Sequence, residues 1–248
     1  MAKQSGAGSA LWFGSVDLSG DVGAITGAET TRAALPITGI DKSAEERTTG
    51  LRDGTLGFTA YWNTAAGGAH LSLLTHPTTD VQVSAAIGTP AVGTAACSIL
   101  AKQTNYAVAR GADGSLVATI NAVGNGYALE WGELLTTGKQ TFASGTVNGA
   151  SIDVGAVSTL FGAAAYLHVF SIGSGNPTVT IKDSADNGTF AALAPTSLVF
   201  TPTVAGVNHL VTGLAATIRR YIRVEVTGTY TNLVAAVIFV RYTESMAV

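Results

Sequence analysis

The strongest local pattern in this chain is the alternation of polar and apolar residues between Thr55 and Trp62. Leu56, Phe58 and Ala60 occupy every second position, with threonine and glycine between them. Successive side chains of a β-strand point to opposite faces, so this period of two predicts a strand with one buried face. The same period recurs along the chain. Valine, threonine, glycine and alanine are abundant, which also favours strands over helices.

The recurring pattern predicts an all-β fold with one short helix. The helix is expected at 67–76, where Ala69, Leu73 and Leu74 share a face and Pro77 follows. Strands are expected at 55–62, 80–86, 96–108, 115–123, 163–172, 178–183, 198–203, 207–212, 221–226 and 233–242.

Two turns and one strand face can be predicted in more detail. Asp53-Gly54 is expected to be the turn that starts the strand at Thr55. The segment Arg110–Gly114 is expected to join its flanking strands as a hairpin. In the strand 221–226, the apolar alternation places Ile222, Val224 and Val226 toward the core.

A polar, turn-rich stretch between Thr136 and Gly149 indicates a domain boundary. We expect a first β domain at 1–144 and a C-terminal β-sandwich at 145–248, because one strand follows another with short turns. The alternative is a single continuous unit, since all-β domains can reach this length.

The balance of basic and acidic side chains argues against tight binding of nucleic acid. Residues 1–144 carry eight basic and eleven acidic side chains, and residues 145–248 carry five of each. Tight binding to phosphates needs a basic face, which neither half supplies. The one local basic cluster is Arg219, Arg220 and Arg223, interpreted as a solvated strand start rather than a phosphate or polymer contact.

Apolar residues make up 47% of the chain, yet no segment predicts a membrane span. The apolar run Leu233–Val240 is far shorter than the roughly 20 residues that a spanning helix needs. The first residues lack the apolar core of a secretory signal, which favours synthesis in the cytoplasm. Small residues leave few bulky side chains for a deep core, so part of the apolar surface is expected to meet other subunits.

Sequence motifs for chemistry are missing. No phosphate-binding glycine loop or nucleophile elbow occurs, and the single cysteine, Cys97, excludes a multi-thiolate zinc site and is expected to be buried. The pairs Glu45-Glu46 and Glu130/Glu133 are interpreted as solvated or intersubunit ion pairs. We therefore predict no catalytic, metal or cofactor residues. The four histidines, expected to be structural, are His70, His76, His168 and His209.

Charged residues are concentrated between Thr38 and Thr55, in a chain that is only 12% charged. We predict that this segment is an assembly element whose ion pairs form between subunits and set their register. The residues of this predicted interface are Asp41, Lys42, Glu45, Glu46, Arg47, Arg52 and Asp53.

The order of these features resembles the major tail tube proteins of long-tailed bacteriophages, particularly those of actinobacterial hosts. The resemblance covers about residues 10–135. It rests on Val16–Gly20, Ile37–Ile40, Leu51–Gly54, the aromatic strand Phe58–Trp62 and Asp80–Val83, with a short helix between the last two. The second half resembles, more weakly, the carbohydrate-binding or discoidin-like sandwiches that phage virion proteins carry.

The resemblance implies a β-sandwich or barrel that assembles as hexameric rings, stacked into a hollow tube through which DNA leaves the capsid. The implied partners are other copies of the chain, the terminator and distal tail proteins, and DNA in transit, with no membrane. The implied location is the virion tail, after assembly in the host cytoplasm. An acidic or neutral first half suits a lumen along which DNA slides without adhering.

Two alternatives remain. A capsid-decoration protein or tail-surface adhesin would bind host glycan through the C-terminal sandwich. Its predicted surface contacts are Tyr166, Tyr221, Tyr230 and Arg223. The other alternative is a β-sandwich hydrolase, for which no nucleophile-base or metal set is recognisable.

Overall fold

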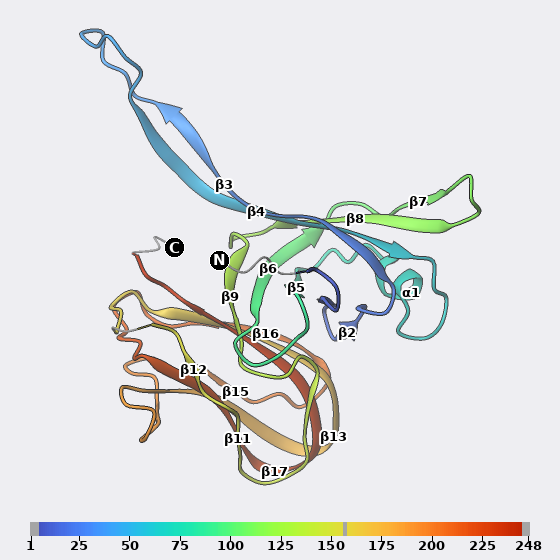
Figure 1. The fold of residues 1–248 in the computed structure, drawn as a ribbon, viewed down its shortest axis with the longest axis vertical. Coiled ribbons are helices and arrows are strands. Elements are labelled where there is room, and N and C mark those ends of the chain that lie inside the picture. The colour runs from blue at the N-terminus through green and yellow to red at the C-terminus, as the bar shows by residue number, and fades with distance from the viewer. Residues whose placement is uncertain (1–4, 156–157, 245–248) are drawn as a thin grey trace. The chain divides into compact units, whose positions relative to one another are not determined.

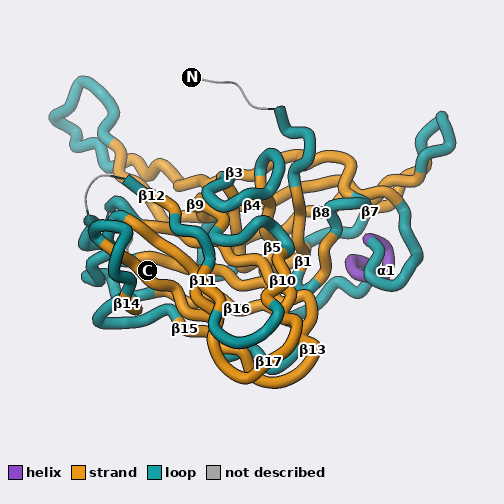
Figure 2. Tube along the Cα trace, turned by 60° about the horizontal axis from the view of Figure 1, so that its bottom comes forward, coloured by secondary structure: helices purple, strands orange, loops and turns teal. Residues whose placement is uncertain are grey.

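The computed structural model describes residues 5–155 and 158–244. It confirms an all-β fold with one short helix, the five-residue α1 (Ala69–Leu73). Figure 2 shows strands throughout the described chain and α1 in purple. The helix is shorter than expected because it starts only after Gly67, which has a positive φ, and ends before His76, which has φ 43°. No helix of the described ranges is long and apolar enough to cross a membrane.

The chain forms two compact units whose segments interleave in sequence. Unit 1 comprises residues 1–20, 84–98 and 131–248, and unit 2 comprises residues 21–83 and 99–130. These units differ from the expected ranges 1–144 and 145–248, because the first expected range contributes to both. Three strands contain a division between units: β5 (Val81–Ala86), β6 (Ala95–Gln103) and β9 (Glu130–Leu134).

Unit 2 is built on four antiparallel strands in the order β3, β4, β8, β7 (Figure 1). Their bounds are β3 Val22–Pro36, β4 Arg47–Tyr61, β7 Ala107–Arg110 and β8 Leu116–Gly124. Leu56, Phe58 and Ala60 are fully buried as the alternation predicts, together with Ile120 of β8. Trp62 is not, since it lies just after β4 with two-fifths of its surface exposed.

Two expectations for unit 2 need correction. Asp53-Gly54 is not a turn but lies inside β4, opposite Thr31 and Thr30 of β3. A Cβ at position 54 would lie 2.3 Å from the Leu129 amide nitrogen, so this glycine permits close packing. The expected strand 96–108 is interrupted at 104–106 and forms β6 and β7. The predicted hairpin at 110–114 is confirmed by the pairing of β7 with β8.

Unit 1 is dominated by the ladder between β13 (Ala163–Ser184) and β17 (Tyr221–Arg241). Both strands bend beside glycines of positive φ, Gly175 and Gly228, and a Cβ on Gly175 would lie 2.1 Å from the Thr229 carbonyl oxygen. Leu167 from one end of β13 and Ile181 from the other therefore share one core. The expected strands 163–172 and 178–183 are thus one strand, as are 221–226 and 233–242.

Shorter strands of unit 1 pair with this ladder, except the first two of the chain, which pair with each other. Within β17, Ile222, Val224 and Val226 are fully buried, as predicted. The remaining strands of the unit are β1 (Ala10–Phe13), β2 (Val16–Asp17), β10 (Gln140–Phe142), β11 (Val147–Asn148), β12 (Ile152–Asp153), β14 (Ala191–Ala192), β15 (Val199–Phe200) and β16 (Gly206–Val211).

A buried polar chain crosses the core of unit 1 at His168. The ring Nδ1 lies 2.7 Å from the Gly14 carbonyl oxygen, which can only accept, so Nδ1 carries the proton. Nε2 then accepts from the Ser84 hydroxyl at 2.8 Å, and Ser84 in turn lies 2.8 Å from the Ser98 hydroxyl. Burial lowers the pKa of His168 to about 4, because a charged ring would lose its hydration. This histidine is a structural residue.

We predict that this histidine makes stability depend on pH. The unfolded chain binds a proton near pH 6.5 and the folded one only near pH 4, so stability is complete above pH 6.5 and declines as the pH falls toward 4. The loss from His168 between pH 7 and 5 is about 2 kcal/mol. Urea denaturation across this range measures it. His168→Gln is expected to reduce the decline by this amount and leave the part due to His209, whose pKa burial also lowers to about 4; an unchanged slope would contradict the assignment.

Candidate assembly surface

The sheet of unit 2 has two edges without a partner strand among the described residues. The outer edge of β3 is one and the outer edge of β7 is the other, because β3 pairs only with β4, and β7 only with β8. All four residues of β7 are exposed, and so are the last eight of β3. Exposed edges carry unpaired N–H and C=O groups that readily pair with another chain.

A two-stranded arm extends from this sheet. β8 accompanies β4 only from Thr55 to Tyr61, so the segment 47–54 of β4 pairs with β3 alone. Figure 1 shows this arm projecting beyond the other strands of its unit. Its end is a closed loop, 37–46, in which the Ile37 and Glu46 backbones are bonded at 2.9 Å and Thr38 Oγ1 accepts from the Glu46 amide. The predicted assembly segment is therefore the distal part of a hairpin.

The predicted interface residues lie on this arm and have partners inside their own chain. At the exposed loop Lys42 Nζ lies 3.7 Å from Glu46 Oε1, and Arg47 pairs with Glu45. Pairs this exposed contribute little to stability. Asp41 is exposed in the same loop, and Asp53 accepts a hydrogen bond from the Gly54 amide at 2.7 Å. Pairing between subunits stays a prediction.

Arg52 differs from the other arm cations because it is tied to the base of the arm. Its guanidinium lies 3.9 Å from the Glu130 carboxylate, and the two side chains are only 17% and 3% exposed. Thr30 adds a hydrogen bond to the Leu129 carbonyl at 2.9 Å. Arg52 therefore anchors the arm within unit 2, a role that its place in the charged cluster did not indicate.

The arm also carries apolar side chains that sequence reasoning missed. Ile40 is wholly exposed, Leu51 is 92% exposed, and Leu35 and Ile37 are about half exposed. Leu35 and Ile37 are two residues apart and so lie on one face. Exposed apolar groups gathered on one projection are typical of an interaction surface. These apolar residues stand among charged residues in the sequence, and this mixture could have indicated that they are exposed.

The basic cluster of unit 1 is neutralised within the chain. Arg219 donates from its Nε to Asp183 Oδ1 at 2.9 Å. Arg220 donates one hydrogen bond to each carboxylate oxygen of Asp153. Arg223 lies 3.6 Å from Glu225 and over the Phe190 ring. These contacts agree with a structural role rather than a phosphate site.

The predicted glycan contacts do not come together on a surface. Tyr230 is only 3% exposed and Tyr166 is fully buried, where it stacks on His209 with ring centroids 4.3 Å apart. Both therefore fail as surface stacking platforms. Tyr221 is partly exposed and its ring is covered by Arg220 at 4.9 Å.

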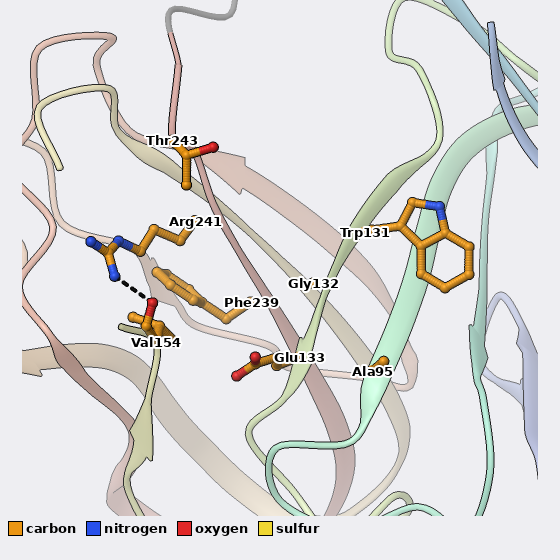
Figure 3. Close-up of a pocket in the computed structure, with 8 residues that line it drawn as sticks. All are labelled: Ala95, Trp131, Gly132, Glu133, Val154, Phe239, Arg241 and Thr243. Carbon is orange, nitrogen blue, oxygen red and sulfur yellow. Dashed lines mark hydrogen bonds between the residues drawn. The ribbon is translucent and has the colours of Figure 1, made fainter. Parts of the chain in front are cut away.

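A cavity of about 300 Å³ lies in unit 1 (Figure 3). Glu133 and Arg241 line it, and Arg241 Nη1 donates to the Val154 carbonyl at 2.6 Å. Burial, and then the charge of Asp153, raise the pKa of Glu133. Figure 3 shows the Trp131 ring turned away from Glu133. The described residues contain no group of three or more histidine, cysteine or acidic side chains placed to hold a metal.

Comparison with known proteins gives little. No family model and no curated protein match the chain. Among solved structures it is similar to the Dit protein (gp 19.1) of SPP1, described as a paradigm of the hub adsorption apparatus in phages that infect Gram-positive bacteria. The two are 12% identical with a TM-score of 0.34, over 94% of this chain and 99% of that one. A similarity this low does not indicate a function for this chain.

We predict that the two arm arginines differ in their effect on stability. Arg52→Ala leaves the buried Glu130 carboxylate without this partner and should lower the free energy of unfolding by about 1–3 kcal/mol. Arg47→Ala, at an exposed pair, should change it by less than about 0.5 kcal/mol. Urea denaturation of the full chain compares them. Equal losses would show that Arg52 does not anchor the arm.

Proposed function

We propose that the chain is a structural protein of a phage tail, which assembles with copies of itself into rings. The observation that carries the proposal is the pair of open edges on opposite sides of the unit 2 sheet. The resemblance of residues 10–135 to tail tube proteins supports the same role. The proposal includes no catalytic residue, metal or cofactor.

The two edges suit a ring because they are different surfaces of opposite strand direction. Each neighbouring pair in the order β3, β4, β8, β7 is antiparallel, so β3 and β7 run in opposite directions. The β3 edge of one copy can therefore meet the β7 edge of the next as an antiparallel pair. Such head-to-tail contacts form a ring if the rotation closes. Closure would satisfy the edge groups of every copy.

One face of the same sheet suits the passage of DNA. On β4 it presents Thr55, Gly57, Thr59 and Tyr61, and on β8 the opposite residues 117, 119, 121 and 123, none of them charged. Lys102, opposite Val123, is paired with Asp80 at 2.7 Å. A surface that neutralises few phosphates holds DNA weakly. We propose that this face lines the lumen.

The full role that we propose is the tail tube. Rings, hexameric as in the family that the sequence resembles, would stack into a conduit for DNA ejection. Terminator and distal tail proteins would contact its two ends. The tube would belong to the virion and assemble in the host cytoplasm.

Electron microscopy of the purified chain across a concentration series tests the proposal. Rings or hollow tubes of uniform diameter are expected. Ala109→Lys places a charge on the exposed edge of β7 and should shift the chain to monomers, because edge lysines oppose strand pairing. Ala112→Lys, in the adjoining turn, is the matched control and should assemble normally. A monomeric parent chain at all concentrations would refute ring formation.

A further inference from the structure

Unit 2 exposes a second apolar cluster, at the end of its sheet opposite the arm. We call Trp62, Leu71, Leu74 and Leu116 the α1 patch; each is between 37% and 47% exposed. Figure 1 shows the arm and α1 at opposite ends of the unit. Two exposed apolar clusters of one unit are thus separated by the length of β4.

The α1 patch is held in place by specific contacts. The Trp62 ring stacks on His70 of α1 with centroids 3.8 Å apart, and His70 Nδ1 lies 2.7 Å from the Tyr106 hydroxyl. The Trp62 amide donates to the Leu116 carbonyl at 3.0 Å. A surface fixed in this way loses little conformational freedom when a partner covers it.

The arm of the same copy cannot cover this patch. Arg47 at the arm tip and Tyr61 beside the patch are the two ends of β4, roughly 45 Å apart at about 3.3 Å per residue. A second copy can bring its arm to the patch. Because the two surfaces differ, such a contact is head-to-tail, and it repeats along an axis where its rotation does not close a ring.

Charge favours the same match. The loop 37–46 carries Asp41, Glu45 and Glu46 against Lys42 alone, and Arg47 follows it, so the arm tip has a net charge of −1. Beside the patch, Arg110 is opposite Leu116 and forms no ion pair among the described residues. Asp113, in the adjoining turn, accepts hydrogen bonds from the Ser115 amide and hydroxyl, which lower its pKa and keep it ionised, so the charge match depends on Arg110, the residue opposite Leu116.

We propose that the apolar tip of the arm docks on the α1 patch of a copy in the neighbouring ring. This inference rests on the proposed ring assembly. The distal arm is roughly 25 Å long and about 10 Å wide, so one face covers far less than the roughly 800 Å² per partner of a stable complex. A single contact is therefore too small to hold a dimer. Repetition around a ring supplies the missing strength.

Cysteine cross-linking tests this contact, because the native Cys97 is buried and does not compete. Ile40→Cys combined with Leu74→Cys should give a ladder of covalent oligomers with a short bismaleimide. Each single variant should give none. Ile40→Cys with Leu160→Cys, at an exposed leucine of unit 1, is the matched control and should stay monomeric on the gel.

The outcomes separate the contact from the ring. Tubes with no ladder from Ile40→Cys/Leu74→Cys would overturn the arm contact and leave ring assembly standing. If the chain formed neither rings nor tubes, the ring proposal itself would be refuted. As an independent readout, Leu71→Asp with Leu74→Asp should leave single rings that no longer stack, and unchanged tubes would count against the docking site.

Discussion

Backbone groups along a strand edge need partners, and this requirement governs the architecture of unit 2. Between Thr55 and Tyr61, β4 pairs with β3 on one side and with β8 on the other, and the side chains of one face are buried. β3 and β7 have partners on one side only among the described strands. In such a sheet the backbone groups of the inner strands are paired, and those along the two outer edges are not paired within the described residues. Its internal pairing and its open edges come from the same four strands.

Sequence alone was sufficient where one face of a strand is buried. The period of two identified β8 and the part of β4 from Thr55 onward, because the core selects Leu56, Phe58 and Ile120 at alternate positions. It missed β3, whose exposed residues face no core and are under no such selection. It also took Gly54 for a turn residue, although the glycine is there to admit the Leu129 backbone. Glycine occurs both at turns and where two backbones approach closely, so the sequence alone does not distinguish the two cases.

Tyr230 shows a different kind of error. It is in phase with Ile222, Val224 and Val226, so continued alternation along β17 would have placed it in the core. The phase changes only after Asn232, which has φ 49°, and from Leu233 onward the odd positions belong to the core that contains Ile222 and Tyr230. The interleaving of the two units was beyond sequence reasoning, since it depends on contacts between distant segments, such as the one between Ser84 and His168.

The order of the two units along the sequence has a consequence for synthesis. Unit 2 is complete once residue 130 has left the ribosome, whereas unit 1 needs β17, near the end of the chain, to pair with β13. Domains fold as units during translation, and pairing between distant segments is slow. The open edges of unit 2 therefore exist before the chain is finished.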